Sequence, residues 1–316
     1  MARYILRRTL LLSVTLLITS LVVFGLTQVL PGDIATLNPS QFASEETKEA
    51  FRESRGLNDP VPVQYVTWLG NFITGDWGIS FNRGNPEVQP LVLERFTNSL
   101  RLAATTLLIA IPISILLGIV AALNEDSWVD SIISIFSLSV VGLPEFVTGF
   151  VLIEIFANNL DLFSSTSTNL PDDGSLTGWL DVLILPALTA TLVLLAYVTR
   201  MTRAGVIDEL KKPYVRTATL KGLPQRQIIF KHVLRNALLP TITIIAISVG
   251  WLIGGLVVIE QVFNYPGLGR ELVTAVQAQN IPMIQAIVML IILAFALANL
   301  AADVLYAVLN PRIRLE

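Results

Sequence analysis

Long apolar runs with few charged positions inside them dominate the pattern of this chain. A helix needs about 20 apolar residues to cross a membrane. Six stretches reach or approach that length, and they are continuously apolar, as suits helices surrounded by lipid. We therefore predict an all-α integral membrane protein with six transmembrane helices. The spans cover residues 9–30, 102–123, 131–157, 182–199, 237–259 and 283–302.

Pro112, Pro144 and Pro186 lie inside these spans. Proline removes a backbone donor, so each is expected to kink its helix. The third span also contains two carboxylates, Glu145 and Glu154, whereas most of the other spans are free of charge.

Composition agrees with a membrane protein. Hydrophobic residues make up 53% of the 316 positions and charged residues 14%, against roughly a quarter charged in soluble domains. The chain lacks the polar surface of a water-soluble enzyme, and six buried core helices account for it poorly. With no Cys and only His232, neither a thiolate centre nor a His-rich metal site is expected. We predict no catalytic residue, no metal and no nucleic-acid partner.

The distribution of positive charge predicts the orientation. Most of the 21 Lys and Arg residues fall before the first span, in the segment 200–240 and after the last span. Because cytoplasmic segments carry the excess of Lys and Arg, we place those three regions and both termini in the cytoplasm. The short loop 124–130 holds Glu125, Asp126 and Asp130 and no base, so it gives this orientation no support. The first span is too long for a secretory signal and is expected to anchor the chain.

Two loops are long enough for structure of their own. In the loop 31–98, Ser44 is expected to cap a helix that stops at Gly56, and Trp68 and Trp77 suit the membrane surface. This loop is either a cap over a transport path or a ligand-binding domain. The basic segment 200–240 alternates polar and apolar positions, which predicts helices over 214–221 and 225–239. Lipid anchoring explains its charge but not its break at Gly222, so a docking element is the better interpretation.

The segment 214–224 reads Tyr-Val-Arg-Thr-Ala-Thr-Leu-Lys-Gly-Leu-Pro. It resembles the coupling loop of ABC importer permeases, whose motif is Glu-Ala-Ala, three residues, Gly and a later Leu-Pro. Arg216, Thr217 and Ala218 stand in the first three places, without the Glu, and Gly222 matches. Residues 56–60, 64–65, 68–69, 75–78 and 260–269 and the C-terminal positions Asn299, Asp303, Tyr306, Pro311 and Arg312 extend the resemblance to the dipeptide, oligopeptide and nickel branch, in particular its first-permease (B-type) subunits.

This resemblance implies the type I ABC importer permease fold and a passive half of a pump in a prokaryotic cell membrane. Its partners would be a second homologous permease, two ABC ATPase subunits carrying ATP and Mg, and an extracytoplasmic binding protein. The chain itself has no phosphate-cradling Gly-x-x-x-x-Gly-Lys-Ser/Thr loop, so it needs no cofactor of its own. The implied division is 1–30 for an N-terminal cytoplasmic stub and first span, 31–98 for the extracytoplasmic loop, and 99–316 for the permease core with coupling loop 200–240.

Two groups of candidate site residues follow. The residues expected to contact an ATPase, rather than merely end a helix, are Tyr214, Arg216, Thr217, Ala218, Lys221, Gly222, Leu223 and Pro224. The candidates for a substrate path are Glu145, Glu260, Asn299 and Asp303. Each of these four has an alternative: pairing with a partner chain for Glu145, capping of the 265–267 turn for Glu260, and interhelical bonding for Asn299 and Asp303, which share a helix face.

The predicted cargo is a di- or oligopeptide. Nickel complexes, glutathione and oligosaccharides are the alternatives that similar permeases leave open. A stand-alone ion-coupled carrier is the rival from another class, but it calls for a relay of intramembrane ionisable residues. Only Glu145 and Glu154 lie well inside a span, and clustered catalytic carboxylates for a membrane-embedded enzyme are absent.

Overall fold

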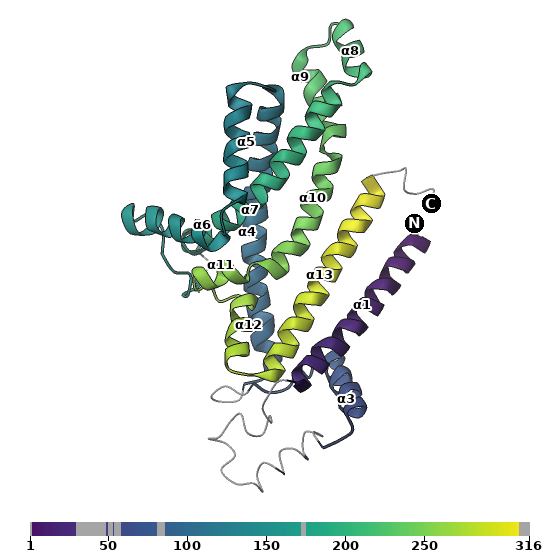
Figure 1. The fold of residues 1–316 in the computed structure, drawn as a ribbon, viewed down its shortest axis with the longest axis vertical. Coiled ribbons are helices and arrows are strands. Elements are labelled where there is room, and N and C mark those ends of the chain that lie inside the picture. Colours follow the sequence, from purple (N-terminus) through teal and green to yellow (C-terminus); the bar gives the residue numbers. More distant parts are fainter. Residues whose placement is uncertain are drawn as a thin grey trace.

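The computed structural model describes residues 2–29, 49, 53, 58–80, 86–171 and 175–309. Over these ranges the chain is helical, with a single isolated bridge between Ile79 and Glu87 (Figure 1). The helix expected over 44–56 and the positions Pro311 and Arg312 lie mostly or wholly outside the described residues. The helices are α1 (Ala2–Val29), α3 (Val61–Thr74), α4 (Val88–Leu123), α5 (Trp128–Val141), α6 (Glu145–Leu152), η1 (Ile153–Asn159), α7 (Leu176–Leu210), α8 (Pro213–Leu220), α9 (Gln225–Gln227), η2 (Ile228–Val233), α10 (Leu234–Gly255), α11 (Val257–Val262), α12 (Leu268–Gln277) and α13 (Ile281–Leu309).

Five helical runs are long and apolar enough to cross a membrane, and a bent pair supplies a sixth candidate. The predicted all-α membrane fold is therefore confirmed. Two helices are longer than the apolar runs that predicted them, since α4 begins at Val88 and α7 covers Leu176–Leu210. Pro112 and Pro186 lie inside these two helices without ending them.

The third predicted span is not one straight helix. Its residues form α5 and then α6 with η1, and the two parts meet at an angle of 108°. Gly142 ends α5 and Pro144 precedes α6, because proline disfavours helical geometry at the residue before it. The kink expected at Pro144 is thus a full break in the helix, and Glu145 begins a new helix instead of lying in mid-helix. Figure 1 shows α6 lying crosswise to the long helices and extending out at the left of the bundle.

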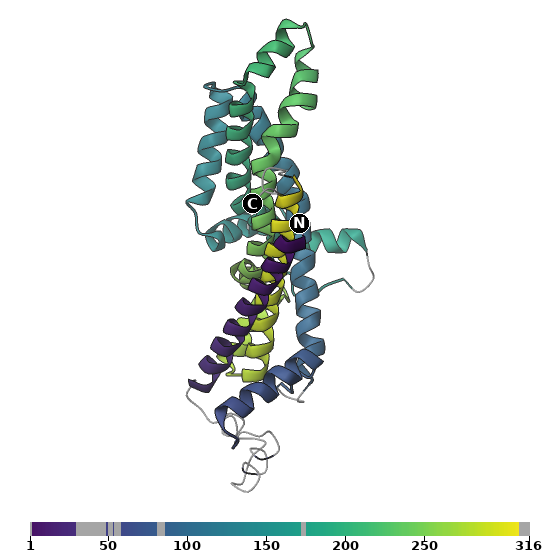
Figure 2. The same cartoon turned by 90° about the vertical axis from the view of Figure 1, so that its right-hand side faces the viewer.

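The two ends of the chain lie side by side. Arg8 of α1 forms a 3.0 Å ion pair with Asp303 of α13, and Gln285 of α13 donates a 2.7 Å hydrogen bond to Thr27 of α1. These contacts make α1 and α13 antiparallel. The start of α1 and the end of α13 point toward the same end of the molecule as α8 and α9, which form its tip (Figures 1 and 2). This arrangement agrees with the predicted location of those three regions on one side of the membrane.

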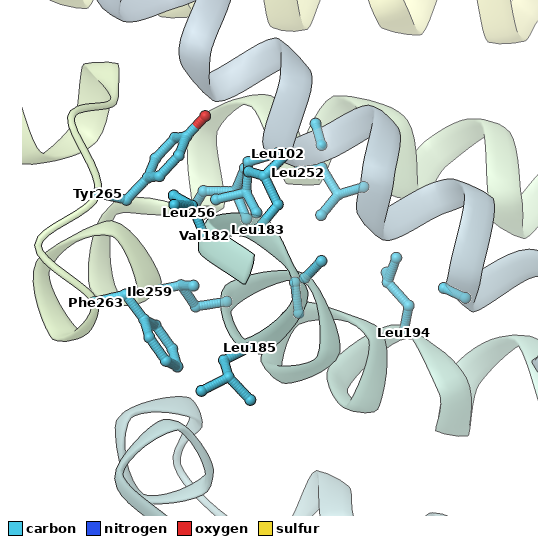
Figure 3. Packing of buried hydrophobic residues seen from close by; sticks show 14 of the residues in the cluster. Leu102, Val182, Leu183, Leu185, Leu194, Leu252, Leu256, Ile259, Phe263 and Tyr265 are labelled. Carbon is cyan, nitrogen blue, oxygen red and sulfur yellow. The ribbon is translucent and has the colours of Figure 1, made fainter. Parts of the chain in front are cut away.

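The core lies where α4, α7 and α10 meet the connection after α10. Leu102 of α4 packs with Leu252 of α10 and with Leu256, which directly follows α10, and Phe263 and Tyr265 complete the cluster (Figure 3). Small residues bring the helices close, as is usual in membranes. A Cβ on Gly118 would lie 2.6 Å from the Thr202 Cβ, and a Cβ on Gly205 would collide with the Ala237 carbonyl oxygen.

Candidate functional site

The tip of the molecule is a short helix held between two long ones. We call residues 211–233 the elbow; it joins the end of α7 to the start of α10 and contains α8, α9 and η2. Pro213 starts α8, since a proline at the first helical position loses no hydrogen bond. Gly222 ends it at φ +75°, a left-handed conformation that favours glycine. The predicted helix–glycine–helix pattern of this segment therefore matches the observed backbone.

One face of α8 packs inward. Val215 and Ala218 lie against the buried cluster of Ile228, Ile229 and Val233, and Leu223 joins them after the turn. The same cluster includes Val206 of α7 and Ala237 of α10. Both arms of the elbow and its tip thus form one packed unit.

A buried carboxylate fixes the elbow to α7. The Glu209 side chain accepts a 2.8 Å hydrogen bond from the Tyr214 hydroxyl and a short ionic one from Lys212. Burial and the bond to Glu209 raise the pKa of the Tyr214 hydroxyl. A hydrogen bond to a charged group contributes about 1.5–3 kcal/mol to stability. The contact with Glu209 therefore holds the first turn of α8 in place.

We call the exposed side chains of the elbow its open face. Arg216, Thr217 and Lys221 are exposed, together with the apolar side chains of Leu220 (81% exposed) and Phe230 (67%). Arg226 and Lys231 add positive charge nearby in the chain. This face combines apolar side chains with a basic rim, which suits a protein surface that offers an apolar pocket and acidic edges.

Sequence reasoning missed Leu220 and Phe230. Helical spacing contained a signal for the first, because Leu220 follows Arg216 by four positions and so shares its face. Phe230 carried no such signal, since it lies in the π-helical η2, whose wider turns change the spacing. Among the predicted contact residues, Gly222 and Pro224 are exposed, whereas Tyr214, Ala218 and Leu223 are partly buried.

The acidic turn between α4 and α5 lies against the base of the elbow. Arg203 of α7 donates two 2.6 Å hydrogen bonds to Asp130, and Lys211 forms a 2.9 Å ion pair with Glu125. Asp130 also accepts a 3.2 Å bond from the Asp126 amide. The loop that gave the orientation no support is therefore acidic because it binds the basic segment.

Away from the elbow, Glu260 is almost completely buried, with 1% of its surface exposed. The Ser99 hydroxyl donates a 2.6 Å hydrogen bond to one carboxylate oxygen, and the Arg270 amide donates a 3.0 Å bond to the other. Burial raises the pKa of the Glu260 carboxyl, while these donors oppose the shift. A Cβ on Gly267 would collide with this carboxylate. Of the two alternatives, the geometry supports a role in holding the 265–267 turn.

Further bonds join the same region to α4. The Tyr265 hydroxyl donates a 2.8 Å hydrogen bond to the Asn98 carbonyl, and the Asn98 side chain donates 3.0 Å to the Pro266 carbonyl. Burial raises the pKa of Tyr265 well above its usual range. We call Asn98, Ser99, Glu260, Tyr265 and Arg270 the polar junction. It ties the α11–α12 connection to α4 across more than 160 positions of sequence.

The other candidates for a substrate path are dispersed. Glu145 is partly exposed at the start of α6. Asp303 pairs with Arg8, and the Asn299 side-chain oxygen faces Gly250 of α10, so both lie at helix contacts as the interhelical alternative expects. The structure does not gather the four predicted path residues into one site, and substrate contact stays a prediction. Over the described ranges, no group of three His, Cys, Asp or Glu side chains is arranged to hold a metal ion.

Comparison with known proteins covers the whole chain. The profile of the binding-protein-dependent transport system inner membrane component matches residues 114–315, and the N-terminal profile of such components matches residues 1–115. The chain is 38% identical to the oligopeptide transport system permease protein AppB of Bacillus subtilis (strain 168) and 37% identical to the glutathione transport system permease protein GsiC of Escherichia coli (strain K12). Both alignments cover 314 residues and 99% of each chain. A crystal structure of an amino acid ABC transporter aligns with 71% of this chain and 94% of the solved chain at 16% identity, with a TM-score of 0.47.

Proposed function

The chain belongs to the family of binding-protein-dependent transport system inner membrane components, and from this premise we propose that it forms half of the translocation path of a peptide importer. It is a multi-pass inner membrane permease and not an ATPase. The single observation that carries the proposal is the open face of the elbow, where Leu220 and Phe230 are exposed beside a basic rim. If ATP is hydrolysed on a partner subunit, a direct contact is needed to transmit the resulting motion to this chain.

The elbow is built to pass force to two spans at once. Glu209 fixes α8 to α7, and the cluster around Val233 fixes it to α10. Close contact between Gly205 and Ala237 keeps the two helices together just behind it. A push on α8 therefore moves packed elements instead of a loose loop, as transmission between distant sites requires.

The proposed partners follow from this role. Two ABC ATPase subunits, carrying ATP and Mg, bind the elbow of this chain and that of a second homologous permease. An extracytoplasmic binding protein delivers the cargo at the opposite face, where residues 31–98 form the extracytoplasmic loop between the first span and the core 99–316. Both termini lie in the cytoplasm with the elbow.

The proposed cargo is a di- or oligopeptide. The relatives AppB and GsiC support this class, since one is named for oligopeptides and the other for the tripeptide glutathione. Nickel complexes and oligosaccharides are the alternatives for the same machinery. Elsewhere in the chain, the dispersion of the predicted path residues argues against the ion relay of a stand-alone carrier.

Co-purification tests the proposal. Tagged chain, expressed with its partner subunits, is expected to retain the ATPases, and Leu220→Asp is expected to release them while the protein stays folded in the membrane. Interface anchors of this kind contribute about 2–4 kcal/mol, a loss of affinity of about a hundredfold. Leu162→Asp is the matched control, because Leu162 is also exposed (59%) but lies in the loop after η1. Uptake by this chain alone, without ATP, would falsify the proposal.

A further inference from the structure

We propose that Arg101 and Trp179 form an anion site that holds the carboxylate of a peptide during its passage along the exposed surface of α4 and α7. The inference rests on the proposed function and assigns a substrate contact to residues outside the predicted path. It follows from the packing of Arg101, the open pocket that it lines and its position along α4.

The guanidinium of Arg101 is held but not neutralised. Its central carbon lies 4.8 Å from the centre of the Trp179 ring, and Nη1 donates a 3.3 Å hydrogen bond to the Asn98 side-chain oxygen. Among the residues that the structure describes, no carboxylate forms a salt bridge with it. The remaining donors of the planar fork are therefore available, and that geometry pairs with both oxygens of a carboxylate.

An open pocket of about 330 Å³ lies beside this cation, on the surface where α4 and α7 meet, and Leu108 in its wall is 76% exposed. Its walls are otherwise mostly apolar or small: Ala104, Thr105, Leu108, Trp179 and Leu183. Binding sites for small molecules begin at about 300 Å³ and combine apolar walls with a few polar groups. A site with one cation and apolar walls fits a carboxylate that carries an apolar side chain. The C-terminal residue of a peptide has both features.

The position of Arg101 along α4 argues against a lipid headgroup as the ligand. Val88, at the start of α4, packs with Met283 and Ile287 in the first turns of the α13 span. Arg101 lies about 20 Å further along the helix at 1.5 Å per residue. The apolar helix Val88–Leu123 is long enough to cross a membrane, and Arg101 lies within it. A charged side chain inside a span is expensive in lipid and usually faces a water-filled cavity or a partner.

The site is also fixed in advance. Asn98, which orients the guanidinium, is bonded on its other side to the Pro266 carbonyl of the polar junction. Thr105, one turn below, donates a 2.9 Å hydrogen bond to the Arg101 carbonyl. A ligand therefore meets a cation whose position requires little further ordering, which lowers the cost of binding.

The test uses the complete transporter in proteoliposomes, with the dipeptide alanyl-phenylalanine and its C-terminal amide as probes. Arg101→Gln is expected to reduce uptake of the free acid by about tenfold or more, the effect of losing a hydrogen-bonded charge, and to reduce uptake of the amide much less. Arg101→Lys is expected to recover part of the rate. Arg7→Gln is the matched control, because Arg7 is an exposed arginine of α1 that lies outside both the pocket and the segment 200–240.

Three results would overturn the inference. Equal uptake of the free acid by wild type and Arg101→Gln would remove the site altogether. An effect of Arg101→Gln that appears in phosphatidylglycerol vesicles and vanishes in phosphatidylcholine vesicles would assign Arg101 to lipid phosphate. Loss of the second permease from the purified variant would assign it to an acidic residue of that subunit. Failure of the proposed function itself is distinguishable, because the wild-type complex would then neither retain ATPases nor take up either probe.

Discussion

The elbow and the polar junction use polar residues in opposite ways. At the elbow, Arg216 and Lys221 extend from the tip without burial, around the exposed side chain of Leu220. At the junction, Ser99 and Glu260 are buried and bonded to each other. A buried polar group must find its hydrogen bonds within the chain, whereas an exposed one can be completed by a partner. The comparison separates residues that hold this chain together from residues that another chain is expected to contact.

The largest effect is expected from breaking the junction. Glu260→Ala strips the buried Ser99 hydroxyl and the Arg270 amide of their acceptor, which costs about 3 kcal/mol of the free energy of unfolding. The thermal midpoint of the detergent-solubilised protein is expected to fall by several degrees. Glu94→Ala, at an exposed position of α4, is the control and leaves the midpoint unchanged. An unchanged midpoint in Glu260→Ala would show that the junction is not a source of stability.

An intermediate effect is expected where the two kinds of region meet, at the anchor of the elbow. Glu209→Ala frees Tyr214 and Lys212, so that α8 loses its fixed position on α7 while the bundle stays folded. We expect ATP-driven uptake to fall about tenfold, from the loss of one or two charge-assisted bonds. Tyr214→Phe removes only one of them and gives a smaller loss. Uptake at the wild-type rate in Glu209→Ala would indicate that the ATPase moves the spans through another contact.

The smallest effect is expected from the rim. Arg216→Gln with Lys221→Gln removes two exposed charges, each of which contributes about 0.2–1 kcal/mol at a solvated surface. The affinity for the ATPase subunits is expected to fall a few fold, and its dependence on salt concentration is expected to weaken. Thermal stability is expected not to change. A salt dependence that persists in the double variant would assign the electrostatic attraction to other residues.

Much of the fold was predictable because lipid imposes a local rule. Each apolar run had to form a helix by itself, and five of the six predicted spans do. A kink at Pro144 was expected, but a bend of 108° was not, since the apolar pattern continues on both sides of Gly142 and Pro144. Pro112 and Pro186 lie within unbroken helices, so proline alone does not predict a turn.

The site was predictable only where its geometry is local. Gly222 predicted the turn after α8. The family resemblance that the segment 214–224 first indicated is confirmed by the comparisons. The hydrogen-bond partners of Glu260 could not be predicted from the sequence, because Ser99 lies 161 positions away in the chain. Arg101 could not be recognised from the sequence, because it precedes a predicted span and its contact with the Trp179 ring of α7 forms only in the folded chain.

The helical run that leaves the elbow has a mechanical consequence. From Gln225 to Gly255 the backbone stays helical over 31 residues, through the π-helical turn and past Pro240, a length of about 46 Å. A flexible tether of the same number of residues would lose a small displacement in its own fluctuations. A stiff helix transmits that displacement to its far end. A movement of the elbow therefore changes the position of residues near Gly255, at the other end of the helical run.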